Sequence, residues 1–125
     1  MAKSVLSAFF IAVILKLFLV DFVIAEGNSM EPAIPSGKVL VVNRLQYGLR
    51  FPGQSGYLLR WASPRQGEVV VFYTPSGSIA VKRCDKVLEE GGFMAQGDNS
   101  PQSYDSRSYG PVSADSIIGK VLGIK

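Results

Sequence analysis

The sequence contains no histidine and only one cysteine, Cys84. Histidine is the commonest general base and the commonest metal ligand, so its absence removes both roles. A single cysteine cannot form an intramolecular disulfide, and no cluster of cysteine and histidine exists to bind zinc or an iron–sulfur centre. The sequence therefore predicts no metal and no cofactor, and a hydrolase of this composition would need Lys, Asp, Glu or Tyr as its base.

Long runs of basic residues are missing as well. The formal net charge is +3, and Lys82 and Arg83 form the sole adjacent basic pair. Nucleic-acid-binding domains usually carry a basic stripe or patch. We therefore predict no nucleic-acid partner.

Only one long apolar run is present, at the N-terminus. Residues 5–15 are apolar apart from Ser7, Lys16 interrupts the run, and it resumes over residues 17–20. The mean hydropathy of +0.22 is high for a small soluble domain. Most of the apolar excess lies before residue 26.

Three interpretations of this run compete. A cleavable signal peptide would need a small-residue cleavage site, which residues 24–26 resemble only weakly, and a buried soluble helix would find no partner helix later in the chain. We favour a short membrane helix at about Ser4–Leu19, with Lys3 on the cytoplasmic side and Lys16 at the outer interface. This interpretation predicts a membrane anchor over residues 1–20, in contact with the lipid bilayer. Because the run is shorter than the roughly 20 residues of a usual span, it must gain length from snorkelling, bilayer thinning or an adjoining segment.

The sequence pattern of residues 21–125 predicts one mostly β domain. Apolar runs alternate with Gly, Pro, Ser and Asn turn signals, and no stretch with a 3.6-residue apolar period follows the N-terminal run. We expect a compact antiparallel β domain in which a turn at residues 74–77 joins two strong strands into a hairpin. The expected strands cover residues 39–45, 57–61, 67–73, 78–87, 93–96 and 117–124.

Ser29 and Lys82 are the candidate catalytic residues. Ser29 lies in a polar turn, residues 27–32, directly after the apolar run. A serine hydroxyl needs a nearby base to become a nucleophile, and Lys82 lies in an apolar strand, on the same face as Ala80 and Cys84 by strand alternation. Burial on that face would lower the lysine pKa from about 10.4 towards neutrality. Taken singly, a serine in a turn and a lysine in a strand are more often ordinary surface residues.

The combination of motifs resembles a type I signal peptidase. This family comprises membrane-anchored Ser/Lys endopeptidases that remove signal peptides from exported proteins. The resemblance covers nearly all of the chain after residue 16, and it implies that the chain runs as a strand into the turn at Ser29. Its blocks, in order, are residues 27–34, 66–72, 81–83 and 97–99, followed by 103–107 and 110–112.

The resemblance implies a role for each matching residue. Ser29 would be the nucleophile and its N–H an oxyanion-hole donor, while Lys82 would be the general base and Ser103 would orient it. Some relatives have a second oxyanion donor two residues before the nucleophile, where this chain has Gly27, so the identity of that donor stays open. The resemblance also implies site support from Met30, packed beneath the turn, from Pro32, Asp98 and Asn99, and from an Asp105–Arg107 ion pair.

Two departures from the family pattern concern substrate docking. Only residues 84–96 separate the lysine strand from the loop at residues 97–99, where bacterial relatives often carry a longer insertion. A Gly-x-Pro-Gly-Asp signature that commonly follows the lysine block is also replaced, by residues 85–92.

The predicted function is removal of signal peptides from exported preproteins by a single-pass enzyme whose domain lies on the outer, periplasmic or extracellular, face. A specialised relative that processes a conjugative-transfer or pilin-type substrate is one alternative. A non-catalytic membrane-tethered β domain is another. A self-cleaving repressor would need a DNA-binding module, which the sequence lacks. The sequence leaves the oligomeric state open.

Overall fold

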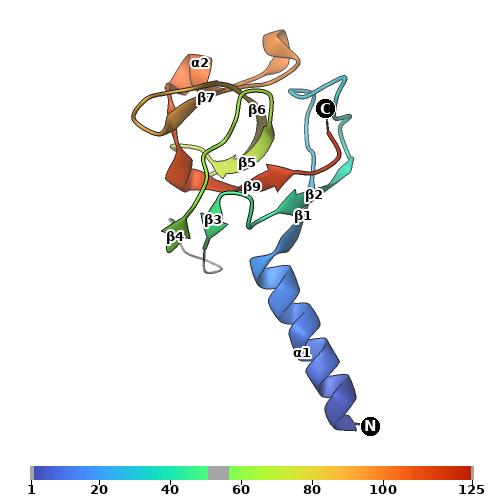
Figure 1. The fold of residues 1–125 in the computed structure, drawn as a ribbon. Coiled ribbons are helices and arrows are strands. Elements are labelled where there is room, and N and C mark those ends of the chain that lie inside the picture. The colour runs from blue at the N-terminus through green and yellow to red at the C-terminus, as the bar shows by residue number, and fades with distance from the viewer. Residues whose placement is uncertain (1, 51–56, 125) are drawn as a thin grey trace.

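The computed structural model describes residues 2–50 and 57–124, and for residues 16–18 it describes the backbone alone. Helix α1 (Ala2–Phe18) projects away from a β body formed by the rest of the chain (Figure 1). Its described side chains from Lys3 to Leu15 are exposed. Within the described residues, no helix is both long and apolar enough to cross a membrane. The predicted membrane anchor therefore stays a prediction, and the predicted place of the Lys16 side chain lies outside the described part.

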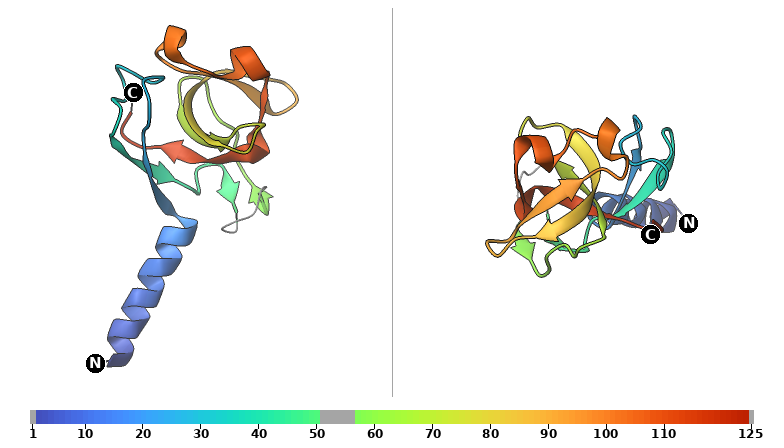
Figure 2. Two further views of the ribbon diagram at one scale, coloured as in Figure 1. Left: turned by 180° about the vertical axis from the view of Figure 1, so that it is seen from behind. Right: turned by 90° about the horizontal axis from the view of Figure 1, so that it is seen from above.

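The β body confirms the prediction of a mostly antiparallel β domain. A seven-stranded sheet has the order β1-β2-β9-β5-β6-β7-β8, with antiparallel pairing throughout, and β3 and β4 form a separate two-stranded sheet. The large sheet curls around a core (Figures 1 and 2). Its strands are β1 (Val20–Ile24), β2 (Val39–Asn43), β5 (Val69–Tyr73), β6 (Ile79–Val87), β7 (Gly92–Gln96), β8 (Val112–Ser113) and β9 (Ile117–Val121).

Strand β5 is buried on both faces, which explains its continuous apolar sequence. Val69 and Val71 pack into one core cluster, with Met30, Leu40 and Val42 among its other members. Val70 and Phe72 point the other way into a second cluster with Cys84 and Phe93. Because successive side chains of a strand alternate between faces, a strand covered on both sides must be apolar at every position.

The β5–β6 hairpin places Lys82 in the body. Thr74 and Gly77 close its turn by backbone hydrogen bonds, and the register pairs Val70 with Lys82. Strand β6 pairs with β7 only from Arg83 onward. Residues 79–82 therefore pair with β5 on one side, and no described strand pairs with them on the other, which leaves an open strand edge.

Three details differ from the expected elements. Among the described residues between 46 and 66, β3 (Gly48–Leu49) pairs with β4 (Leu59–Arg60), and β4 is shorter than the strand expected at 57–61. The last strand ends at Val121, shortly before Gly123 with a φ of 78°. Short helical turns follow β7, at η1 (Ser100–Gln102), α2 (Ser106–Tyr109) and η2 (Ala114–Ser116). An apolar period does not predict these turns, because helices this short are made by capping and turn residues, such as the Asp105 N-cap of α2.

Candidate active site

The turn that carries Ser29 is anchored by its neighbour Met30. Met30 is 4% exposed and packs into the core cluster that also contains Leu40 and Val71. Its carbonyl accepts a hydrogen bond from the Ile34 N–H (2.9 Å), which closes the turn. Ser29 is therefore held at the surface of the core by an apolar side chain next to it, as the sequence led us to expect.

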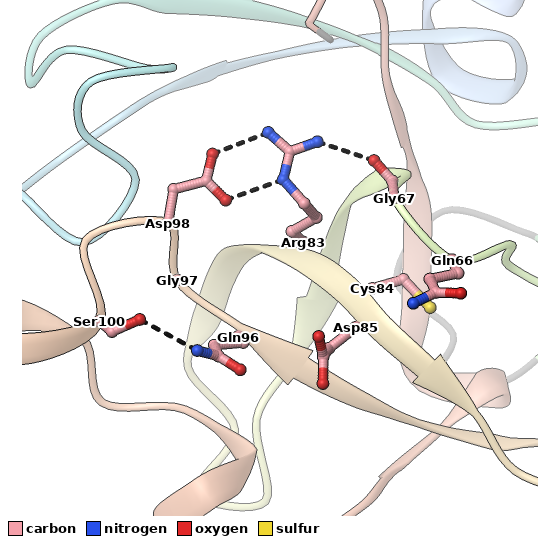
Figure 3. Close-up of a pocket in the computed structure, with 9 residues that line it drawn as sticks. All are labelled: Gln66, Gly67, Arg83, Cys84, Asp85, Gln96, Gly97, Asp98 and Ser100. Carbon is pink, nitrogen blue, oxygen red and sulfur yellow. Dashed lines mark hydrogen bonds and ion pairs between the residues drawn. The ribbon is translucent and has the colours of Figure 1, made fainter.

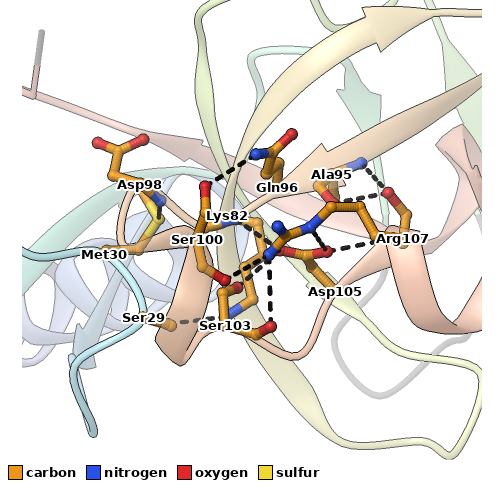
Figure 4. Close-up of polar contacts among 12 residues, drawn as sticks. Ser29, Met30, Lys82, Ala95, Gln96, Asp98, Ser100, Ser103, Asp105 and Arg107 are labelled. Carbon is orange, nitrogen blue, oxygen red and sulfur yellow. Dashed lines mark hydrogen bonds and ion pairs between the residues drawn. The ribbon is translucent and has the colours of Figure 1, made fainter.

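The structure brings Ser29 and Lys82 together from positions 53 residues apart. Lys82 Nζ donates a hydrogen bond to Ser29 Oγ at 2.8 Å (Figure 4). Lys82 is 6% exposed, which confirms the prediction that it is buried in its strand. Burial lowers the pKa of the Lys82 ammonium below its ordinary value; the charge of Asp105 opposes this shift and that of Arg107 reinforces it.

A loop after β7, residues 97–99, holds the Ser29 turn in place. The Asn99 N–H donates to the Ser29 carbonyl at 2.8 Å, and the Asn99 side-chain amide donates to the Asn28 carbonyl at 3.0 Å. The Asp98 N–H donates to the sulfur of Met30 at 3.4 Å (Figure 4). We call residues 97–99 the clamp loop, because three of its donors reach three consecutive residues of the turn.

Arg83 ties the clamp loop to the lysine strand. Its Nε and Nη2 bind the two Asp98 carboxylate oxygens at 2.8 and 2.7 Å, and its Nη1 donates to the Gly67 carbonyl at 2.8 Å (Figure 3). A bidentate pair of this kind fixes geometry as well as charge. This link between Arg83 and Asp98 was not predicted, although Arg83 lies beside Lys82 in one of the matching blocks.

Asp105 is the buried centre of a second polar network. Its side chain is 1% exposed, and it accepts hydrogen bonds from Ser103 Oγ (2.7 Å), from the Gly97 N–H (2.9 Å) and from Arg107 Nε (2.8 Å) (Figure 4). Burial by itself would raise the pKa of the Asp105 carboxyl, but these hydrogen bonds lower it below its usual range. A full negative charge is therefore maintained near Lys82.

Ser103 makes a different hydrogen bond from the one that the resemblance implies. Within the described residues its hydroxyl donates to Asp105, and no hydrogen bond joins it to Lys82. The carboxylate that Ser103 contacts does act on the lysine, because Asp105 is the charge that raises the Lys82 pKa. In this arrangement Ser103 is linked to Lys82 through the charge of Asp105.

Gly97 is a site residue for which the sequence predicted no role, although it lies in the matching block at residues 97–99. A Cβ atom at this position would lie 2.5 Å from the Ser29 carbonyl oxygen and would also overlap Ser103 Oγ. No side chain fits between the Ser29 turn and the Asp105 network. This close approach explains why a glycine begins the clamp loop.

A hollow of about 440 Å³ opens beside Ser29 and Lys82. One wall comes from β1 and the start of the turn, residues 23–27, and the facing wall comes from residues 79–82 of β6. Thr74 and Tyr104 also line it. The free edge of β6 and mostly apolar walls suit an extended peptide chain.

The remaining predicted residues have modest local roles. Pro32 lies in the turn after Ser29, and the Glu31–Pro32 peptide bond is cis. Gly27 has a φ of 78°, and a Cβ atom there would meet no atom within 4 Å. Among the described residues the Ser29 N–H has no hydrogen-bond acceptor. In the same described part, no group of His, Cys, Asp and Glu could hold a metal ion.

Comparison with known proteins supplies the family. The family model described as signal peptidase, peptidase S26, matches residues 1–85 and 78–124. A Signal peptidase I of Pseudomonas fluorescens is 34% identical over 121 residues, which are 97% of this chain and 40% of that protein. A Signal peptidase I of Bacillus caldolyticus is 28% identical, over 86% of this chain and 80% of the relative. A mitochondrial inner membrane protease subunit 1 of Xenopus tropicalis is 31% identical, over 81% of this chain and 66% of the relative.

These matches cover the sequence blocks on which the resemblance was based, and they confirm it. The chain spans less than half the length of the Pseudomonas fluorescens relative. The family model nevertheless accounts for almost every residue of this chain. The protein belongs to the signal peptidase family, peptidase S26.

Proposed function

We propose that this protein is a serine endopeptidase that cleaves with Ser29 and Lys82. The observation that carries the proposal is the 2.8 Å contact between Lys82 Nζ and Ser29 Oγ, made by a lysine that is almost fully buried. A charged lysine donates in this contact. When the amine is neutral, the same geometry lets the Ser29 hydroxyl donate its proton to Nζ, and burial favours the neutral form.

The reaction follows from this proton transfer. Ser29 Oγ attacks the scissile carbonyl carbon while Lys82 takes the hydroxyl proton, and collapse of the tetrahedral intermediate expels the amine, which receives that proton from Lys82. Lys82 then takes a proton from a water molecule that attacks the acyl-enzyme ester. Collapse of the second tetrahedral intermediate breaks the ester bond, releases the new carboxyl end, and lets Lys82 return that proton to Ser29 Oγ. The Ser29 N–H has no other acceptor in the described structure, so it is available to the oxyanion.

The groove supports a particular class of substrate. An extended chain lying along the free edge of residues 79–82 would pair with β6 and present its carbonyl to Ser29. Ala25 and Ala80 line the hollow, with Val81, Met30 and Ile34, so it favours small apolar side chains before the cleaved bond. Signal peptides of exported preproteins fit this description, and the names of the relatives support the same class of substrate. We propose a role in protein secretion on that basis.

Helix α1 supports attachment to a membrane. Phe9 and Phe10 are 68% and 67% exposed, and apolar side chains cover the helix on all sides. A helix without a polar face is unfavourable in water. We propose that residues 1–20 anchor the chain to the bilayer, with the domain of residues 21–125 on the outer, periplasmic or extracellular, face.

The first test compares the parent chain with Ser29→Ala and Lys82→Met in cleavage of a preprotein by membranes that contain the protein. Each change removes one partner of the proposed dyad, so the cleavage rate should fall by at least about 1,000-fold. Ser36→Ala and Lys86→Met are matched controls, because both residues are exposed and neither lines the hollow.

A parent-like rate for either dyad variant would disprove this mechanism. A serine-directed acylating probe separates the enzyme from a non-catalytic binding domain, since only an activated Ser29 would be labelled. Trapped acyl-enzyme would in turn identify the substrate and distinguish a general signal peptidase from a relative specialised for pilin-type or conjugative-transfer substrates.

A further inference from the structure

The hollow beside Ser29 has two chemically different ends. At one end lie residues 79–81 of β6 opposite residues 23–25, where the walls are apolar. Past Lys82 the edge of β6 is closed, because Arg83 pairs with Gln96 of β7. Tyr104 also lines the hollow. Its neighbours Ser103 and Asp105 lie against Gly97, which follows Gln96, so we place Tyr104 at this second end.

Tyr104 is an exposed aromatic residue on a rigid support. Its side chain is 70% exposed, and its ring meets the Tyr109 ring edge-on, with 5.3 Å between centroids and 64° between planes. Its neighbours on both sides, Ser103 and Asp105, are joined by a 2.7 Å hydrogen bond. The residues that flank Tyr104 are therefore tied together, the ring has an aromatic neighbour on one edge, and most of its surface faces solvent.

The position of the dyad decides which part of a substrate reaches this ring. The cleaved carbonyl must lie at Ser29 Oγ, and the residues before it occupy the open edge of residues 79–82. The residue after the cleaved bond continues past Lys82, towards the loop that contains Tyr104. Its side chain would be the first group of the leaving half to meet an aromatic surface.

We propose that Tyr104 determines specificity for the residue directly after the cleaved bond, and that it favours a large apolar or aromatic side chain there. This inference rests on the proposed peptidase function. A Leu or Phe side chain would cover the exposed ring and remove apolar surface of both groups from water. Aromatic contacts of this kind correspond to a preference of about 3- to 10-fold.

The experiment uses the full chain in detergent micelles and one parent peptide made with Ala, Leu, Phe, Lys or Asp after the cleaved bond. The parent protein, Tyr104→Ala and Tyr104→Phe are compared by kcat and KM for each peptide. Trp61→Ala is the matched control, because Trp61 is also exposed (54%) and does not line the hollow.

The parent protein should cleave the peptides with Phe or Leu after the cleaved bond with a kcat/KM about 3- to 10-fold higher than that for the Ala peptide. Tyr104→Ala should abolish this ranking, mainly through KM, whereas Tyr104→Phe and Trp61→Ala should retain it. A uniform loss on all five peptides would overturn the inference, because that result indicates a structural role. So would a parent ranking led by Lys or Asp, or one that Tyr104→Ala leaves intact. Parent protein that cleaves none of the peptides would instead refute the proposed function and remove the basis of the inference.

Discussion

At Lys82, burial and charge act on the same pKa in opposite directions. Burial lowers it, the Asp105 carboxylate raises it, and the Arg107 guanidinium lowers it again. Asp105 is in turn kept charged by the hydrogen bonds from Arg107, Gly97 and Ser103. Within the described structure, the residues of the second polar network therefore influence the Lys82 pKa without a hydrogen bond or ion pair to its amine.

A pH prediction follows at this scale. The proposed reaction needs neutral Lys82, and the neutral fraction rises with pH, so kcat/KM should rise along an acid limb whose midpoint lies below the ordinary lysine pKa of about 10.4. Asp105→Asn removes the charge that raises the Lys82 pKa, so the limb should move to lower pH. The same change removes a buried acceptor of several hydrogen bonds and should cost about 2–4 kcal/mol of stability.

Asp85→Asn is the control for this pH profile, because Asp85 is an exposed aspartate of the same strand as Lys82 and contributes no charge effect to its pKa. The profile is recorded at a temperature where thermal melts show both variants to be folded. A limb that moves to higher pH in Asp105→Asn would contradict the assignment of the base. So would an equal shift in Asp85→Asn.

Among the elements, the clamp loop determines the geometry of the site. It follows β7, pairs with Arg83 of β6 through Asp98, and donates hydrogen bonds to the turn between β1 and β2. Three segments far apart in sequence are joined at this one loop. Ser29 and Lys82 stay within hydrogen-bond distance because the loop fixes the turn relative to β6.

Gly97→Ala tests the clamp loop. The new Cβ would lie 2.5 Å from the Ser29 carbonyl oxygen, so the turn or the loop must shift. Overpacking of this kind costs about 1–3 kcal/mol, and displacement of the nucleophile should lower kcat by 100-fold or more. Thermal melts measure the loss of stability, and peptide cleavage measures kcat.

Gly77→Ala provides the comparison for this experiment. Gly77 has a positive φ, of 88°, which Gly97 does not have, but a Cβ atom at Gly77 would meet nothing within 4 Å and the residue lies outside the hollow. It should lose about 1 kcal/mol of stability and keep the parent kcat. If Gly97→Ala behaves like Gly77→Ala, close packing at the clamp loop does not control catalysis.

The whole molecule consists of an exposed apolar helix and a β body that contains the site. Phe9→Asp combined with Phe10→Asp should move the protein from the membrane fraction to the soluble fraction, because each charge opposes insertion by about 2.5–3.5 kcal/mol. The Leu double variant of the same positions should stay with membranes. Retention of the Asp variant in washed membranes would show that α1 is not the anchor.

Much of the fold was predictable because its signals are local. The apolar runs of β5 and β6, the turn between them and the mostly β class all follow from neighbouring residues. The hairpin β3–β4, the strand β8 and the helix α2 were not predicted. Two-residue strands and one-turn helices have too few side chains to produce a periodic pattern, so tertiary contacts and caps decide whether they form.

The candidate site divides in a similar way. The lack of histidine and the apolar strand around the lysine made Ser29 and Lys82 candidates, and the ordered motifs that resemble a signal peptidase were needed to predict that they form a pair. The link from Arg83 to Asp98 and the contact of Ser103 with Asp105 were not predictable. Both depend on side-chain directions in loops, which carry no sequence periodicity.

By itself the sequence limited which chemistry was possible, because the absence of histidine and the single cysteine left Lys, Asp, Glu or Tyr as the base of a hydrolase. Only the tertiary structure decided which of these side chains lies beside Ser29. A hydrogen bond forms over about 3 Å, and no pattern over a sequence separation of 53 residues specifies such a distance. The β5–β6 register, the clamp loop and the missing side chain at Gly97 together bring Lys82 Nζ to Ser29 Oγ.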